Sequence, residues 1–304
     1  MRSSATLALV VSILGAVSCE KKQVAAVPPA TQNSGTANAA TVYVAVGEKL
    51  EKPFVDRIKE LDPSTVNEEV IRELDTHASE VASLLAASRI DSCDFGLPVE
   101  TMDTLRPHLA KCRESIRLLR ADGVRCIAQG DGGGAAQRAA AIARMSLHLY
   151  KQSECCIDLL VASAASQTAS NLIEKFGSVQ LPAAEKQDLL AALDALDFSK
   201  AHEPVVNDIR LTAKFVRTGD GPADYLATLE AATAQQRAEA ASALEALAND
   251  LPSLWDMDHP EFRITERFDK LPPLAQRLMP AISRVRIGVR DNARLVEVAK
   301  KRLN

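Results

Sequence analysis

The sequence predicts an all-α protein, and three observations support this class. Aromatic residues make up only 4% of the 304 residues, and strands favour bulky aromatic and β-branched side chains. Apolar residues recur at spacings of three and four over most of the chain, which is the period of a helix face. No segment shows the apolar–polar alternation of a half-buried strand. We therefore expect a long antiparallel helical hairpin, extended by further helices into a bundle or a short solenoid-like array.

The hairpin is the most regular part of the predicted fold. A heptad seam of apolar side chains predicts its first helix over residues 101–129. The dense glycines of residues 130–134 favour a turn over a continued helix. An Ala-rich stripe then predicts a second helix over residues 135–176, which should pack antiparallel to the first.

Shorter helices are predicted on both sides of the hairpin. Before it, residues 40–61 form one or two helices broken near Pro53. A capping box that begins at Thr65 precedes a helix over residues 67–87. After the hairpin we expect four further helices, the last of them kinked or restarted at Pro280. Their expected ranges are 183–196, 203–217, 222–249 and 274–296.

The first 18 residues have the layout of an export signal. Arg2 supplies a positive charge, the apolar run over residues 5–17 is too short to span a bilayer, and small residues precede Cys19. The segment resembles a bacterial lipoprotein signal, in which the cysteine after the cleavage site is acylated. The resemblance implies covalent lipid such as palmitate on Cys19, with no other cofactor, and anchoring to a membrane of the cell envelope. The alternative is an ordinary secretory signal, cut at the same bond, that leaves Cys19 unmodified.

The segment after the signal is rich in Pro, Ala, Ser, Thr and Asn and has no apolar face. Such a composition predicts a disordered tether over residues 19–40, followed by an all-α body over residues 41–304. The body could divide into a hairpin half, residues 41–178, and a second half, residues 183–304. Glu20 stands where an inner-membrane lipoprotein would carry Asp, which favours the outer membrane. The formal charge of −4 gives no indication of a nucleic-acid partner.

Three stretches of the body resemble a family of exported helical-hairpin proteins of planctomycete-type bacteria, whose hairpins are similar to tetratricopeptide units. They are ASRIDSCDFG (residues 87–96), TLRPHLAKCRESIRLL (residues 104–119) and GDGGGAAQRAAAIARMSLHL (residues 130–149). The chain departs from the family at Phe95, where Trp is usual, and at Arg106, where Leu is usual. The resemblance implies a fold and an export route, and it implies no activity.

The cysteines of the body are the first candidates for chemistry. If the hairpin folds about Gly132, then His108, Cys112, Cys155 and Cys156 come within about a turn of one another. Core packing accounts for them most simply, because seam positions need apolar side chains and a free cysteine behaves as one. A disulfide that joins Cys112 to Cys156 or Cys155 is a second interpretation, favoured by an oxidising exported compartment. A metal site that uses the imidazole and the three thiolates is the third.

A second candidate group is Asp256, Asp258 and His259, which share one predicted loop and could hold a cation or simply be solvated. The cationic residues from Arg277 to Arg302 could contact anionic lipid or wall polymer, or form the solvated face of an amphipathic helix. Sequence motifs of hydrolases, zinc proteases, P-loop proteins and dinucleotide-binding enzymes are absent.

These observations together predict a lipid-anchored, non-catalytic helical scaffold or binding protein of the cell envelope, which presents a groove to a protein or peptide partner. The alternative is a metal- or thiol-dependent envelope enzyme that uses one of the two candidate groups.

Overall fold

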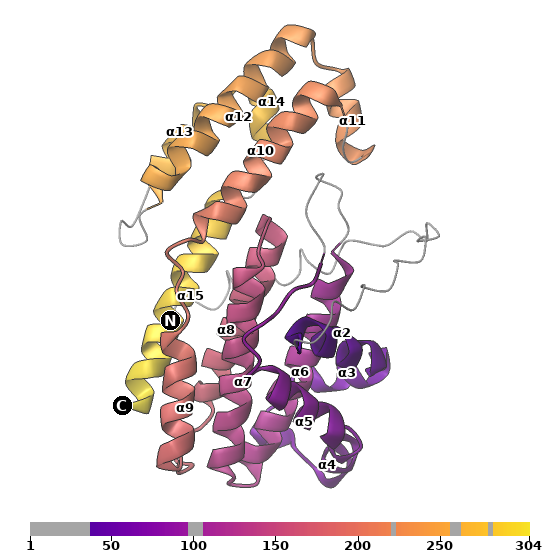
Figure 1. Cartoon of the computed structure of the whole chain (residues 1–304), viewed down its shortest axis with the longest axis vertical. Helices are drawn as coiled ribbons and strands as arrows, with labels where there is room; N and C mark the ends of the chain where they lie inside the picture. Colours follow the sequence, from indigo (N-terminus) through magenta and orange to yellow (C-terminus); the bar gives the residue numbers. More distant parts are fainter. Residues whose placement is uncertain (1–36, 97–105, 220–222, 256–262, 279–281) are drawn as a thin grey trace. The chain divides into compact units, whose positions relative to one another are not determined.

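The computed structural model describes residues 37–96, 106–219, 223–255, 263–278 and 282–304. Every regular element in these ranges is a helix, and the ranges contain no strand. The helices pack against one another in a bundle-like arrangement (Figure 1). The predicted all-α class is therefore confirmed.

The predicted hairpin is formed by α6 (Pro107–Ala128) and α7 (Gly132–Lys151), which pack together (Figure 1). Gly130 turns the chain with a left-handed φ of 74°, a conformation that suits glycine because it has no Cβ atom. The Asp131 carboxylate then caps α7 by accepting the Gly134 N–H at 2.8 Å. Local sequence chemistry thus produces the predicted reversal.

The second helix of the hairpin is shorter than predicted. Instead of one helix over residues 135–176, the chain forms α7 and then α8 (Cys156–Glu174), which packs back along α7. The break is stabilised from outside the hairpin, because Asp208 accepts the Cys156 N–H at 2.8 Å. A capped helix start can form there although the apolar spacing continues across it.

Within residues 37–96, four helices precede the hairpin: α2 (Ala39–Lys49), α3 (Lys52–Ile58), α4 (Glu68–Asp75) and α5 (Ala78–Ala87). The single helix predicted over residues 67–87 is wrong, because the chain breaks between α4 and α5. Thr65 is also not the cap of α4: it belongs to the short 3-10 turn η1 (Pro63–Thr65), whose cap is Asp62. Asn67 caps α4 instead, and its side-chain oxygen accepts the Val70 N–H at 2.9 Å.

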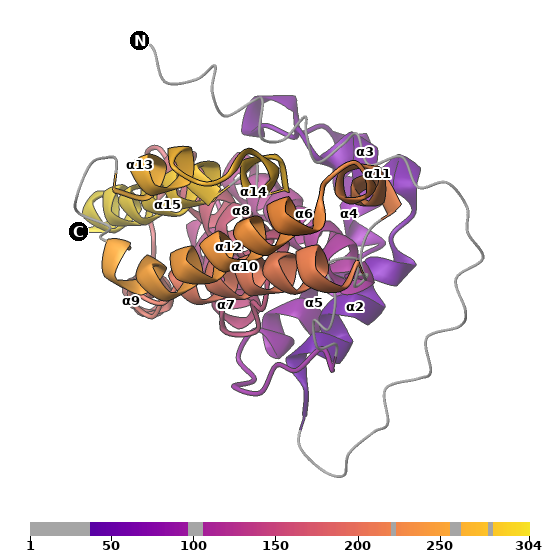
Figure 2. The same ribbon diagram turned by 90° about the horizontal axis from the view of Figure 1, so that it is seen from above.

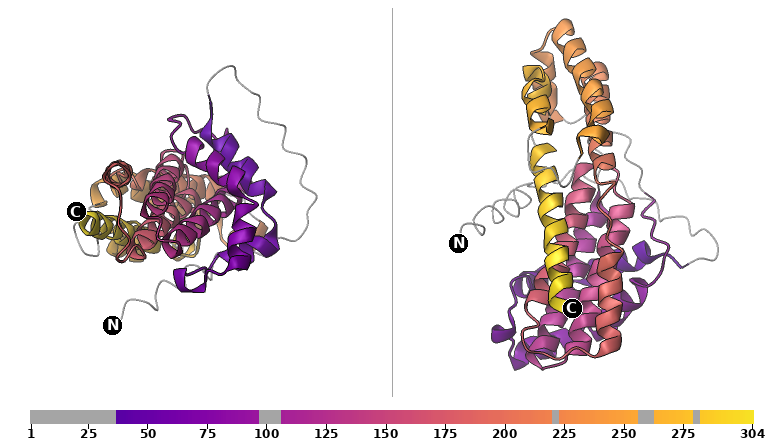
Figure 3. Two further views of the ribbon diagram at one scale, coloured as in Figure 1. Left: turned by 90° about the horizontal axis from the view of Figure 1, so that it is seen from below. Right: turned by 90° about the vertical axis from the view of Figure 1, so that its left-hand side faces the viewer.

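The remaining helices follow α8. They are α9 (Ala183–Asp194), α10 (His202–Thr218), α11 (Ala223–Glu230), α12 (Ala234–Leu254), α13 (Arg263–Asp269), α14 (Pro273–Leu278) and α15 (Ile282–Leu303). The helix predicted over residues 222–249 is two helices, because a capping box between Thr233 and Gln236 starts α12. Figure 2 shows α10 and α12 side by side, and Figure 3 shows α15 alongside α8 and α9. Pro280 lies outside the described residues.

Contacts join residues Ala37–Asn304 into one compact unit. It includes both predicted halves, since α9 packs on α7 and α15 packs on α8. The unit begins a few residues before the predicted body, because Asn38 caps α2 by accepting the Ala40 N–H. Residues 1–36, with the predicted signal, Cys19 and most of the predicted tether, lie outside the described residues. Among the helices that are described, none combines the length and the apolarity that a membrane span requires.

Candidate functional site

The predicted histidine and cysteine residues lie around two different groups: His108, Cys155 and Cys156 are all close enough to Asp158 to interact with its charge, and Cys112 interacts with Cys93. Cys112 is fully buried, and the titratable group that acts on its thiol is Cys93. Cys155 and Cys156 lie at the corner between α7 and α8, where the charged groups acting on them include Asp158.

Neither of the more specific interpretations of these residues is realised in the structure. All five cysteines of the described ranges are free thiols, so Cys112 is not joined to Cys155 or Cys156. The described part of the chain contains no group of three or more His, Cys, Asp or Glu side chains that could hold a metal ion. The other predicted group, Asp256, Asp258 and His259, lies outside the described residues.

Burial also moves these side chains away from reactive protonation states. It raises the pKa of Cys93 and of Cys155 to about 12 and that of Cys126 to about 11. Burial and then the Arg106 charge lower the pKa of His108 to about 4. At neutral pH these cysteines are thiols, which are weak nucleophiles, and His108 is uncharged.

Next to His108 lies a buried ion pair that the sequence analysis did not identify. Arg106 Nε donates to Asp158 Oδ1 at 2.9 Å and Nη2 to Oδ2 at 2.5 Å, and the two side chains are only 8% and 3% exposed. His108 itself stacks on Phe95 with ring centroids 4.4 Å apart. The sequence did contain a signal, because Asp158 is the only charge in the apolar run over residues 157–165. A buried charge requires a partner.

The start of α8 is held by two neighbouring side chains of α10. Asp208 accepts the Cys156 N–H, and Asn207 Nδ2 donates to the Glu154 carbonyl oxygen at 2.6 Å. Burial and the nearby Asp158 charge raise the pKa of Asp208 although the hydrogen bonds from Cys156 oppose this shift. The carboxylate therefore acts as a helix cap supplied by another helix.

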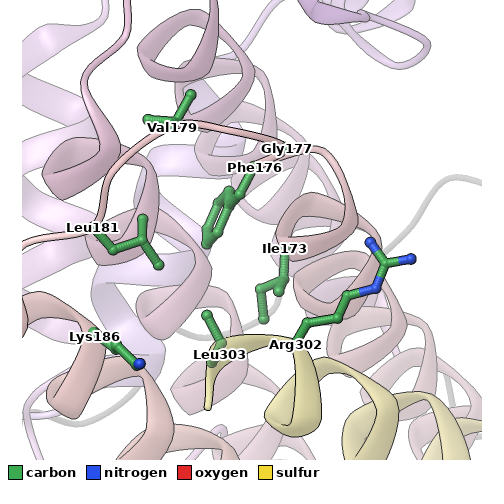
Figure 4. A pocket seen from close by; sticks show the side chains of 8 residues that line it. All are labelled: Ile173, Phe176, Gly177, Val179, Leu181, Lys186, Arg302 and Leu303. Carbon is green, nitrogen blue, oxygen red and sulfur yellow. The ribbon is translucent and has the colours of Figure 1, made fainter.

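A different region of the described chain contains a pocket. This pocket of about 430 Å³ opens where the end of α8, the connection to α9, α9 itself and the last turn of α15 meet. Figure 4 shows Phe176 and Leu303 facing each other across it, with Lys186 and Arg302 at opposite ends. Its lining residues are Ile173, Phe176, Gly177, Val179, Leu181, Lys186, Arg302 and Leu303.

The pocket is lined by five apolar residues, Gly177 and two cations, and most of its accessible surface is polar. Ile173, Phe176 and Leu303 are buried, so the wall is part of the packed structure. Arg302 Nη1 donates to the Glu174 carbonyl oxygen at 3.4 Å, and its Nη2 lies 4.0 Å from the Glu174 carboxylate. Lys186 has no ion-pair partner among the described residues.

The pocket could not be predicted from the sequence because its residues come from two stretches, 173–186 and 302–303, that are far apart along the chain. Only the cationic end of the last helix, which includes Arg302, had been considered for contact with an anionic ligand.

Comparisons with family models, with curated proteins and with solved structures found no match to the chain. The resemblance to bacterial lipoprotein signals and the resemblance to exported helical-hairpin proteins therefore stay predictions.

Proposed function

We propose that the protein is a lipid-anchored, non-catalytic binding protein of the bacterial cell envelope. The observation that carries the binding role is the pocket between α8, α9 and α15, which has a cationic side chain at each end. Its volume of about 430 Å³ falls within the range of roughly 300–1,000 Å³ typical of small-molecule sites.

The protonation states of the buried groups support a non-catalytic role. Catalytic nucleophiles and bases have pKa values adjusted toward the working pH. In this chain burial moves both pKa values away from pH 7: it raises the pKa of Cys155 and lowers the pKa of His108. A thiol and a neutral imidazole therefore predominate at pH 7. The helices that form the pocket also pack against one another: α15 contacts both α8 and α9.

The envelope location rests on the export signal and on Cys19. A lipid on Cys19, followed by the predicted tether, would hold the helical body near a membrane while leaving its pocket open to solvent. Several acyl chains on one residue give firm anchoring, since each buried methylene contributes about 0.8 kcal/mol.

Detergent partitioning of the full chain made in a bacterium tests the proposal. We expect the wild-type protein to enter the detergent phase and Cys19→Ala to remain aqueous or unprocessed. Ser34→Ala, in the same predicted tether, is the matched control and should partition like the wild type. If Cys19→Ala and the wild type partition alike, the protein is not lipid-anchored through Cys19.

A further inference from the structure

We propose that the pocket between α8, α9 and α15 binds a short dicarboxylate, with one carboxylate at each end of the pocket. This inference rests on the proposed binding function and names the chemical class of its ligand. The observations that carry it are the two cations at opposite ends of the pocket, the weak contacts that these cations make within the chain, and the polar surface between them.

The surface that a ligand can reach favours a polar molecule. The apolar lining residues Ile173, Phe176 and Leu303 are 3%, 6% and 5% exposed, so neighbouring side chains already cover them. Most of the surface that stays open in the pocket is polar. Since little apolar surface remains to be removed from water, hydrophobic burial would add little to the affinity of a ligand. The affinity therefore comes mainly from charge and hydrogen bonds.

Lys186 supplies the charge at one end of the pocket. Its side chain is half-buried on α9, and its ammonium group has no ion-pair partner within the described part of the chain. An ammonium group on a flexible stem can reach an anion placed between it and Leu303 (Figure 4). A carboxylate there would gain a charge-assisted hydrogen bond without displacing an existing partner from this group.

Arg302 supplies the charge at the other end. Its guanidinium donates to the Glu174 carbonyl oxygen at 3.4 Å and lies 4.0 Å from the Glu174 carboxylate. The two side chains are 54% and 46% exposed, so this long contact is solvated and weak. A guanidinium group has five N–H donors and a planar fork that matches a carboxylate. A ligand can therefore bind beside Glu174 or replace it.

The two ends together define the ligand. Among the described residues that line the pocket, only Lys186 and Arg302 are charged. Each end thus offers one cation, which matches the single charge of a carboxylate better than a phosphate group with nearly two charges. Because the cations lie at opposite ends, the two carboxylates must also lie at opposite ends of the molecule. The volume of about 430 Å³ is near the lower end of the range for small-molecule sites, which indicates a short ligand.

Ligand-observed NMR titration of the full chain in a nonionic detergent tests the inference. The probes are malonate, succinate, glutarate and adipate, together with the monocarboxylates of the same chain lengths. We expect one dicarboxylate to bind most tightly, because only one length spans both cations. It should bind about fivefold more tightly than its monocarboxylate, which is the contribution of one partly exposed ion pair.

Substitution of the two cations shows whether the ligand spans the pocket. Lys186→Gln and Arg302→Gln should each weaken the best dicarboxylate about fivefold, since each removes one ion pair. A monocarboxylate can use either cation, so each single substitution should weaken it only about twofold. Lys301→Gln is the matched control, because Lys301 is an exposed neighbour of Arg302 on α15 that does not line the pocket. It should change neither affinity, and helical circular dichroism should be the same in all three variants.

The inference is overturned if no dicarboxylate binds more tightly than its monocarboxylate, or if only one of the two cations affects the best dicarboxylate. An effect of Lys301→Gln as large as that of Arg302→Gln would also overturn it, because the binding would then reflect diffuse surface charge. Binding to vesicles of phosphatidylglycerol without binding to any dicarboxylate would overturn it as well and indicate a lipid surface. None of these results changes the detergent partitioning of the wild-type chain, so failure here is distinguishable from failure of the lipid anchor.

Discussion

Arg106, at the start of α6, and Asp158, in the first turn of α8, form a buried two-point ion pair across 52 residues of sequence. Asp158 Oδ2 also accepts the Glu154 N–H at 3.0 Å, so the same carboxylate holds the chain where it enters α8. The pair thus joins the beginning of the hairpin to the helix that follows it.

Removal of this carboxylate should destabilise the protein strongly. Asp158→Ala leaves the buried Arg106 guanidinium without its carboxylate, and breaking a buried pair costs about 3–5 kcal/mol. Urea unfolding followed by helical circular dichroism measures the loss. Asp56→Ala is the matched control: Asp56 pairs with Lys59 on the surface, both about half exposed, so the cost should stay below about 1 kcal/mol. Equal effects of the two substitutions would contradict a structural role for the buried pair.

The two glycines that begin α7 should respond differently to an added methyl group. A Cβ atom at Gly132 would lie 2.1 Å from the Gln180 carbonyl oxygen, whereas the nearest heavy atom to one at Gly133 is 3.5 Å away. Gly132→Ala should therefore cost about 1–3 kcal/mol of the free energy of unfolding. Gly133→Ala should be neutral or stabilising by up to about 1 kcal/mol, because alanine favours helix. A similar loss of the free energy of unfolding in both variants would show that the Gln180 carbonyl group does not lie close to Gly132.

Asp208 should make the free energy of unfolding depend on pH, and the sign of this dependence follows from its pKa shift. Because its pKa is raised in the folded state, the folded protein binds the proton more tightly than the unfolded chain does. The stabilisation that results is fully present below the unfolded pKa of about 3.9 and is lost as pH rises through the folded pKa. Relative to Asp208→Asn, the wild type should therefore lose free energy of unfolding as pH rises from about 4 through the raised folded pKa.

Asp197 provides a control with the opposite slope. Hydrogen bonds from the Ser199 N–H and hydroxyl lower the pKa of its carboxyl group. The stabilisation from Asp197 is present above its unfolded pKa and is lost as pH falls through its folded pKa. As pH rises, the free energy of unfolding of the wild type should therefore increase relative to that of Asp197→Asn. Slopes of the same sign for Asp208 and Asp197 would contradict the assignment of Asp208 as a buried cap.

His108 should titrate far below an ordinary histidine. Its buried ring, stacked on Phe95, has a pKa lowered to about 4, compared with about 6.5 in an unfolded chain. The ring carbon signals in a pH series of NMR spectra report this value directly. A midpoint near 6.5 would mean that the ring is solvated and that the α6 start is packed differently.

The sequence predicted the hairpin well because its turn depends on neighbouring residues. Gly130 adopts the left-handed conformation and Asp131 caps the next helix, and both effects act within a few positions. Helix breaks that depend on distant partners could not be predicted in this way. The start of α8 relies on Asn207 and Asp208, which lie 51–52 residues beyond it, and the apolar spacing alone continues through the break.

The candidate site could not be predicted from the sequence for a related reason, since it also depends on how separate helices pack. The predicted proximity of Cys112 to Cys155 and Cys156 assumed one continuous helix, whereas α7 ends at Lys151 and α8 begins at Cys156. The pocket in turn brings Leu303 against Phe176, a pairing that depends on how α15 lies on α8. No periodicity within either helix contains that information.

The mass of the N-terminal peptide of the membrane-extracted protein tests the central claim most directly. After proteolysis, the account predicts a peptide that begins at Cys19 and carries acyl groups on that residue. A peptide that begins at Cys19 with a free thiol, or one that still contains residues 1–18, would contradict the lipid-anchored binding protein proposed here.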